Sequence, residues 1–109
     1  MSKVRTRVLS SSPRRRFEAL SPLPSVDALV ATEAPSEPLH CLRPRTLATN
    51  ARAFRAGFPG RTLYAVKCNP DPRVLRALWN AGIRAFDCAS LSEIMLVRQM
   101  FDAADIHFM

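Results

Sequence analysis

The chain has 109 residues, of which 48% are hydrophobic and 23% charged, and this length and composition fit one small globular domain. No apolar run approaches the ~20 residues that span a membrane, no Cys and His spacing matches a zinc site, and three cysteines without a secretory apolar segment argue against a disulfide framework. The formal net charge of +7 does not indicate a basic binding face, because residues 1–16 carry six basic and no acidic side chains and the other 93 carry ten basic and nine acidic ones.

Residues 1–38 are predicted to form a flexible N-terminal extension that begins with this basic segment and contains five prolines. The basic segment is typical of a solvated chain end, which is the interpretation that we favour. It would also suit non-specific contact with nucleic acid or a membrane surface, or an organellar transit peptide, because it is rich in Arg and Ser. It contains no aromatic residue to stack on bases, which weakens the nucleic-acid interpretation.

From residue 39 onward we expect folded structure, and its first two elements are a helix and a strand. Apolar residues recur at steps of three and four between Leu47 and Phe58, which predicts a helix. Pro44 suits the first turn of that helix, and a Pro-Gly turn ends it. The short apolar run 63–66 then predicts a buried strand.

Two more helices and two more strands are predicted in alternation. Asp71 can cap the second helix, and Gly82 ends it. Residues 83–86 are the second strand candidate, the segment Ser90-Leu91-Ser92-Glu93 matches a capping box that opens the third helix, and 105–109 is the third strand candidate. Helices that alternate with strands imply a parallel sheet with right-handed crossovers. Three parallel strands cannot close a barrel, so we expect the beginning of a larger α/β protein.

Lys67 is the strongest candidate for chemistry, because it directly follows the predicted buried strand. The carboxyl ends of parallel strands face the active site in α/β folds. A lysine there can act as a Schiff-base nucleophile once desolvation favours its neutral amine. The small Ala65, expected on the same strand face as Lys67, would leave room for a flat ligand. The alternative is a lysine that merely reaches from a strand end into solvent.

Asp87 is expected at the equivalent end of the second strand, where adjacent parallel strands would bring it near Lys67. Its charge could stabilise a protonated amine there. Alternatively, it could simply accept hydrogen bonds from local backbone N–H groups. Glu93 is explained by the capping box alone, and we favour that role over a role in a site.

Two motifs make the chain recognisable, namely Tyr64-Ala-Val-Lys-Cys-Asn69 and Phe86-Asp-Cys-Ala-Ser90, with twenty residues from the lysine to the aspartate. Together with Glu93-Ile94 they closely resemble eukaryotic-type ornithine decarboxylases, which belong to the fold-type III, alanine-racemase-like barrel class of pyridoxal-phosphate enzymes. The resemblance extends over about residues 39–109. It implies the N-terminal portion of a parallel (β/α)8 TIM-type barrel, incomplete and preceded by a disordered basic tail.

The resemblance also implies a function, namely decarboxylation of a basic amino acid, ornithine or lysine, to a diamine in polyamine biosynthesis. In this family the lysine that matches Lys67 holds pyridoxal 5'-phosphate covalently, and the cofactor takes up the electron pair left when carbon dioxide departs. Asp87 matches an aspartate close to that lysine, and Glu93 matches a glutamate near the same site. The family has no catalytic histidine at His107, which is therefore interpreted as a structural strand residue. A homodimer in the cytoplasm is expected for the full-length protein.

The chain also departs from the family pattern. It has no match to the ring-stacking histidine, the glycine-rich phosphate loop, the glutamate that pairs with the pyridine nitrogen, or the C-terminal domain. A barrel needs roughly 250 residues, so we expect a fragment that is inactive alone. A diaminopimelate-type decarboxylase would also fit the Tyr-Ala-Val-Lys motif. A non-catalytic, decarboxylase-like regulatory or binding protein is a further alternative, although retention of Lys67 and Asp87 argues against it.

Overall fold

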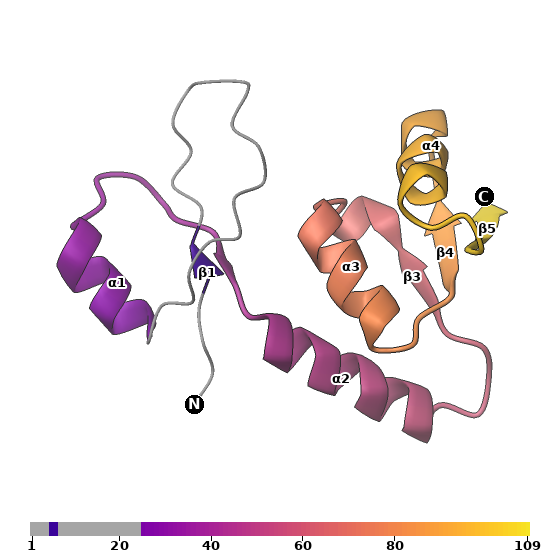
Figure 1. Ribbon diagram of the computed structural model, residues 1–109, viewed down its shortest axis with the longest axis horizontal. Coiled ribbons are helices and arrows are strands. Elements are labelled where there is room, and N and C mark those ends of the chain that lie inside the picture. The colour runs from indigo at the N-terminus through magenta and orange to yellow at the C-terminus, as the bar shows by residue number, and fades with distance from the viewer. Residues whose placement is uncertain (1–4, 7–24) are drawn as a thin grey trace. The chain divides into compact units, whose positions relative to one another are not determined.

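The computed structural model describes residues 5–6 and 25–109, and the chain divides into two compact units, residues 1–45 and 46–109. Figure 1 shows helices and strands alternating along the second unit. The elements in chain order are β1 (Arg5–Thr6), α1 (Val26–Glu33), β2 (Cys41–Leu42), α2 (Pro44–Gly57), β3 (Leu63–Ala65), the 3-10 turn η1 (Val66–Cys68), α3 (Pro72–Asn80), β4 (Ala85–Cys88), α4 (Leu91–Met100) and β5 (Asp105–Phe108).

In the first unit, α1 lies where the sequence predicted only a flexible extension. The Ser25 side chain caps the helix by accepting a hydrogen bond from the backbone N–H of Ala28 at 3.0 Å. Leu29 is buried, and Ala34 ends the helix in the left-handed conformation with φ of 39°. A good cap and a run of residues without Gly or Pro explain a helix between flanking prolines.

The flexible extension predicted over 1–38 is therefore wrong at 26–33. The short strands β1 and β2 also pair antiparallel, with Arg5 opposite Leu42. The remainder of the basic segment lies outside the described residues, so its flexibility stays a prediction. The two units divide after Arg45, whereas the folded domain was predicted to begin at residue 39.

The second unit contains a parallel three-stranded sheet in the order β3-β4-β5. The helices α3 and α4 connect successive strands, which confirms the predicted α/β alternation. The register places Ala65 beside Asp87 and Asp87 beside His107. Residues paired in this way point to the same face, so these three side chains form a row across the sheet.

The helices of this unit begin where local sequence signals placed them. Pro44 begins α2, Asp71 caps α3 and Ser90 caps α4. The Asp71 carboxylate accepts from the backbone N–H of Arg73, and the Ser90 hydroxyl accepts from that of Glu93. Each cap satisfies a backbone donor that the helix cannot satisfy internally.

The strands differ from the prediction by one or two residues. β3 ends at Ala65, because the backbone turns into η1 at Val66. β4 begins two residues later than expected, since the N–H of Ile83 still bonds to the Leu78 carbonyl at 3.0 Å and closes α3. As a result, Asp87 lies within β4 and not beyond its end.

An aromatic cluster closes the helix-covered face of the sheet. Phe86 of β4 is fully buried, and its ring centroid lies 6.4 Å from that of Trp79 in α3 and 5.6 Å from that of Phe101 after α4. Trp79 and Phe101 stack directly at 4.4 Å. Because Phe86 points toward the helices, the alternation of side chains turns Asp87 to the opposite face. The remaining large buried side chains of this unit include Val66, Val74, Leu75, Leu78, Ile83, Cys88 and Val97.

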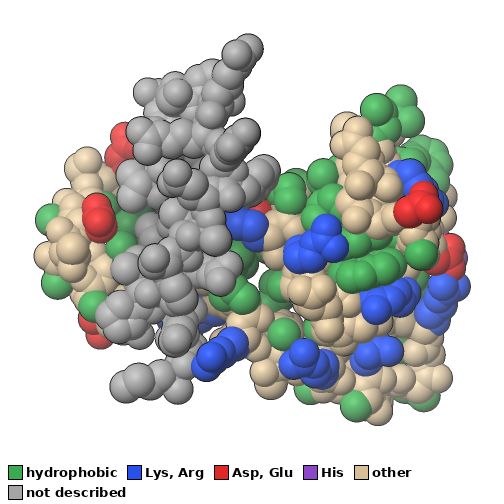
Figure 2. All heavy atoms as spheres, in the orientation of Figure 1, with side chains coloured by type: hydrophobic (Ala, Val, Ile, Leu, Met, Phe, Trp, Pro, Cys, Tyr) green, Lys and Arg blue, Asp and Glu red, His purple; other side chains and the backbone are tan. Residues whose placement is uncertain are grey.

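Hydrophobic side chains also reach the surface, on the face of the molecule drawn in Figure 2. Among residues 25–109, no helix combines the length and the apolar character needed to cross a bilayer. In the second unit the large exposed apolar residues are Phe54, Phe58, Leu91, Met95, Phe108 and Met109.

Truncation of Phe86 tests this description of the core. We expect Phe86→Ala to lower the free energy of unfolding by about 3–5 kcal/mol, because a fully buried ring is replaced by a cavity. The control Phe54→Ala removes a ring that is 57% exposed, and it should cost less than about 1 kcal/mol. Urea unfolding of both variants measures the two costs, and equal costs would contradict the packing described.

Candidate functional site

Lys67 lies in η1, directly beyond the carboxyl end of β3. Within this turn Val66 is fully buried, whereas Lys67 and Cys68 are exposed. The prediction that Lys67 shares a strand face with Ala65 is wrong, because the 3-10 turn replaces the twofold alternation of a strand. The Lys67 side chain is exposed in the described residues, so the partly dehydrated amine stays a prediction.

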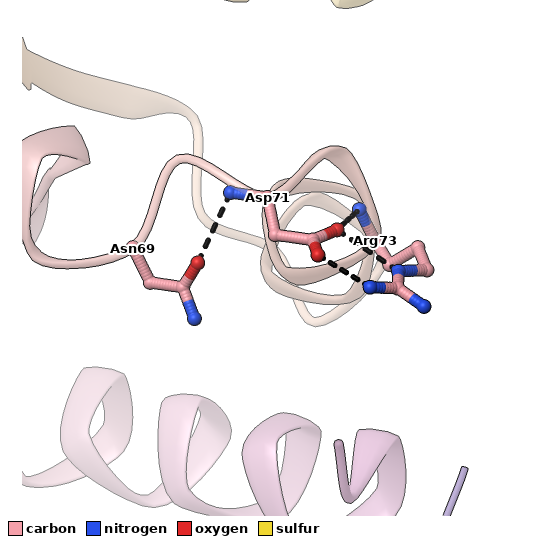
Figure 3. A network of polar contacts seen from close by, with 3 residues as sticks. All are labelled: Asn69, Asp71 and Arg73. Carbon is pink, nitrogen blue, oxygen red and sulfur yellow. Dashed lines mark hydrogen bonds and ion pairs between the residues drawn. The ribbon is translucent and has the colours of Figure 1, made fainter. Parts of the chain in front are cut away.

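Hydrogen bonds close the segment that contains Lys67. The Tyr64 hydroxyl, at the start of the segment, donates to the backbone oxygen of Asn69 at 3.1 Å. The side-chain oxygen of Asn69 in turn accepts from the backbone N–H of Asp71 at 3.1 Å, as Figure 3 shows. The turn is therefore fixed at both ends, by β3 on one side and by the cap of α3 on the other.

The cap itself is reinforced by Arg73. Its Nε and Nη2 atoms donate to the two oxygens of the Asp71 carboxylate at 3.0 and 2.5 Å (Figure 3). The hydrogen bond to Asp71 raises the pKa of Arg73 above its ordinary value, against the opposing effect of desolvation. This bidentate ion pair anchors the first turn of α3 and, through Asn69, the end of the lysine segment.

Asp87 is half-buried and lies one strand away, beside Ala65 in the register. Neighbouring strands lie about 4.8 Å apart, and Lys67 follows two residues after Ala65. No ion pair joins Lys67 and Asp87 among the residues that the structure describes. The register therefore places Asp87 beside Ala65, two residues before Lys67, and a closer approach of the two charged groups stays a prediction.

Glu93 acts in the helix cap, as the sequence indicated. Its Oε2 atom accepts from the backbone N–H of Ala89 at 2.5 Å, while its own N–H donates to the Ser90 hydroxyl at 3.3 Å. The contact is a capping box displaced by one residue, since the carboxylate bonds the residue before the cap. Cys88, the last residue of β4, precedes this cap. Burial raises the pKa of its thiol, and the charges of Glu93 and Asp87 raise it further. A buried thiol with a raised pKa favours its neutral form, which fits a structural role for Cys88.

His107 occupies the row that contains Asp87, on the face that the helices leave uncovered. Its Nε2 atom lies 3.5 Å from the carboxylate of Asp105. The sequence analysis interpreted His107 as structural and did not place it beside Asp87. Strand alternation predicts only that Asp105 and His107 share a face, whereas the pairing of His107 with Asp87 depends on the register between β4 and β5. The Tyr64–Asn69 bond had no sequence signal, because a spacing of five residues across a turn matches no common pattern.

Tyr64 offers a direct measurement of the environment around the turn. Burial raises the pKa of its hydroxyl above the ordinary value of 10.0, and the charge of Cys68 adds to this, while the bond to Asn69 works in the other direction. Tyr64 is the single tyrosine of the chain, so the near-ultraviolet phenolate absorbance reports on it alone.

We expect an absorbance midpoint above pH 10.0 in the folded chain. Because the folded state then holds this proton more tightly than the unfolded state, its contribution to stability is present below pH 10.0 and is lost as the pH rises through the folded pKa. The urea-unfolded chain is the control and should titrate at the ordinary value. A folded midpoint at or below that of the unfolded chain would contradict the partly buried hydroxyl.

Comparison with protein-family models gives a match over residues 45–109 to the pyridoxal binding domain of pyridoxal-dependent decarboxylases. Neither the curated proteins nor the solved structures gave a significant match. The matched region is more than half of the chain and contains Lys67, Asp87 and the whole parallel sheet. The match confirms the α/β barrel class and the pyridoxal cofactor that the two motifs implied. The chain therefore belongs to the pyridoxal-dependent decarboxylase family, within which it carries the pyridoxal binding domain.

Proposed function

We propose that this protein decarboxylates a basic amino acid, ornithine or lysine, to a diamine that enters polyamine biosynthesis. The observation that carries the proposal is the position of Lys67, an exposed amine at the carboxyl edge of a parallel sheet within a pyridoxal binding domain. The choice of substrate is supported by the Lys67-Cys68-Asn69 and Phe86-Asp-Cys-Ala-Ser90 segments, which resemble the ornithine and lysine branch of the family.

The residues of the site suit the aldehyde of pyridoxal phosphate. Lys67 makes no ion pair within the described part of the chain, so its amine has no partner to lose before it reacts with an aldehyde. The small Ala65, beside Asp87 in the strand register, would leave room for a flat ring there. When bound, the cofactor supplies the electron sink that decarboxylation needs.

The neighbouring residues would position and stabilise this amine. The bonds from Tyr64 to Asn69 and from Asn69 to Asp71 hold the turn, which would fix the point from which the Lys67 side chain extends. The Asp87 carboxylate, one strand away, would favour a protonated nitrogen at Lys67 by charge. A cytoplasmic homodimer is part of the proposal, on the strength of the family resemblance.

Covalent trapping tests the assignment of Lys67. The sequence contains only two lysines, Lys3 and Lys67, so the variants Lys67→Arg and Lys3→Arg form a matched pair. After incubation with pyridoxal phosphate and reduction with borohydride, peptide mass spectrometry should find the pyridoxyl group on Lys67. The adduct should vanish in Lys67→Arg and persist in Lys3→Arg, and the opposite pattern would refute the assignment.

Asp87→Asn, which keeps the size of the side chain and removes its charge, serves as a third variant in this experiment. It should keep the adduct on Lys67 but lower its occupancy by about two- to fivefold, the range of a solvent-accessible charge pair. An occupancy equal to that of the unaltered chain would contradict the assignment of Asp87 to the site.

The substrate is tested by release of carbon dioxide from carboxyl-labelled amino acids. The native protein, purified from its source and loaded with pyridoxal phosphate, should release label from ornithine or lysine faster than from arginine or diaminopimelate. A preference for diaminopimelate would overturn the substrate assignment and leave the family intact. No release from any of the four would favour a non-catalytic binding protein.

A further inference from the structure

A second charged region lies at the end of the sheet opposite Lys67. A cavity of about 240 Å³ opens where β3 and β4 begin, next to the last turn of α2. It is lined by three arginines, Arg55, Arg61 and Arg84, together with small residues such as Gly60, Gly82 and Ala85. We call this the arginine cavity, and nothing in the chemistry proposed for Lys67 uses it.

The arginine cavity carries an excess of positive charge. Among the described residues, Asp105 is the one carboxylate paired with these arginines, and its partner is Arg61. Desolvation opposes ionisation of Asp105, but the hydrogen bond and charge of Arg61, aided by His107, outweigh it and hold the pKa of Asp105 below its ordinary value. Asp105 thus stays ionised and cancels one charge. Within residues 5–6 and 25–109, Arg55 and Arg84 bond only uncharged backbone oxygens, so two positive charges remain there.

Contacts with backbone carbonyls hold Arg55 and Arg84 in place, and Arg84 also packs on an aromatic ring. The Arg84 guanidinium lies 4.0 Å above the Trp79 ring, and its Nη1 atom donates to the carbonyls of Trp79 and Ile83 at 2.6 and 3.0 Å. Nη1 of Arg55 donates to the Ala81 carbonyl at 3.3 Å. A guanidinium has five N–H donors, and the bonds formed within the described residues use Nη1 alone. Each arginine therefore keeps donors for a ligand at little cost in side-chain ordering.

Gly82 is what allows Arg55 to reach the cavity. Its φ of +100° lies in the region that favours glycine, because a Cβ is strained there. A Cβ at this position would in addition collide with the guanidinium group of Arg55. Gly82, which follows the end of α3, thus also leaves the space that the Arg55 guanidinium occupies.

We infer that the arginine cavity binds the phosphate group of a small molecule or free phosphate. Two guanidinium groups that line one cavity and keep spare donors suit the oxygens of an oxyanion, and their combined charge suits a dianion. The inference does not rest on the proposed decarboxylation, because the cavity lies at the amino ends of β3 and β4 and Lys67 lies beyond the carboxyl end of β3.

Titration of the full chain with inorganic phosphate tests the inference. Backbone amide signals followed by NMR, at constant ionic strength adjusted with sodium chloride, should shift saturably and most strongly at Gly60–Thr62 and Gly82–Arg84. A parallel titration with glycerol phosphate identifies the source, since tighter binding than inorganic phosphate indicates a phosphate monoester and weaker binding indicates the free ion. Lys67→Arg should bind phosphate unchanged, so that failure of the proposed function and failure of this site are distinguishable.

Variants locate the binding site. Arg55→Gln and Arg84→Gln should each weaken phosphate binding by about tenfold, because each removes charge-assisted hydrogen bonds. The control Arg52→Gln, on an exposed position one turn earlier in α2, should leave the affinity unchanged.

A second pair keeps the test valid if an arginine variant fails to fold. Thr62 lines the cavity, so Thr62→Glu adds a carboxylate beside the intact arginines and should abolish binding, whereas Thr62→Gln should retain it. Equal phosphate affinity in the unaltered chain and all of these variants, or no saturable shift at all, would overturn the inference.

Discussion

The parallel pairing of β3 with β4, with Ala65 beside Asp87, is the constraint on which the rest of the structure depends. A slip of one residue would exchange the two faces of β4, turning Asp87 into the aromatic cluster and Phe86 out to solvent. Phe86 is fully buried between Trp79 and Phe101, so burial of one ring opposes that slip. The packing of the helix-covered face thereby decides which polar groups the other face presents, and it places Asp87 beside Ala65 at the carboxyl end of β3.

The two ends of the same sheet carry different functional groups, an amine at the carboxyl end and guanidinium groups at the amino end. At the carboxyl end, the exposed amine of Lys67 stands on a short turn that Tyr64 and the cap of α3 hold in place. At the amino end, Arg55 and Arg84 bond to the carbonyls that close α3, and no described carboxylate pairs with either of them. In both places the positioning comes from backbone atoms at the ends of α3. That helix thus links a site that would bind an aldehyde to a cavity that would bind an anion.

Much of this arrangement could be predicted from the sequence. Most of the parts that could not be predicted have one cause in common, which is that they depend on contacts between separate elements. Helix starts were predictable because a cap is local, as at Pro44, Asp71 and Ser90. The two motifs were enough to identify the family, which the match over residues 45–109 confirms.

The ends of the strands differed from the prediction because they depend on strand pairing and on where the preceding helix ends, as the Ile83 N–H shows. The turn at Lys67 was missed because its geometry depends on the contact between the Tyr64 hydroxyl and Asn69, which no local pattern encodes. The helix α1 was missed because the prolines around it were taken to indicate an extended segment, and the cap at Ser25 was not considered.

The strand register is the central claim, and cross-strand nuclear Overhauser contacts in the folded chain measure it most directly. The account predicts backbone contacts that pair Leu63 with Ala85 and Ala65 with Asp87, and continue from Asp87 to His107. Contacts that pair Ala65 with Phe86 or Cys88 would contradict it, because they would turn the Asp87 carboxylate to the helix-covered face and away from the lysine.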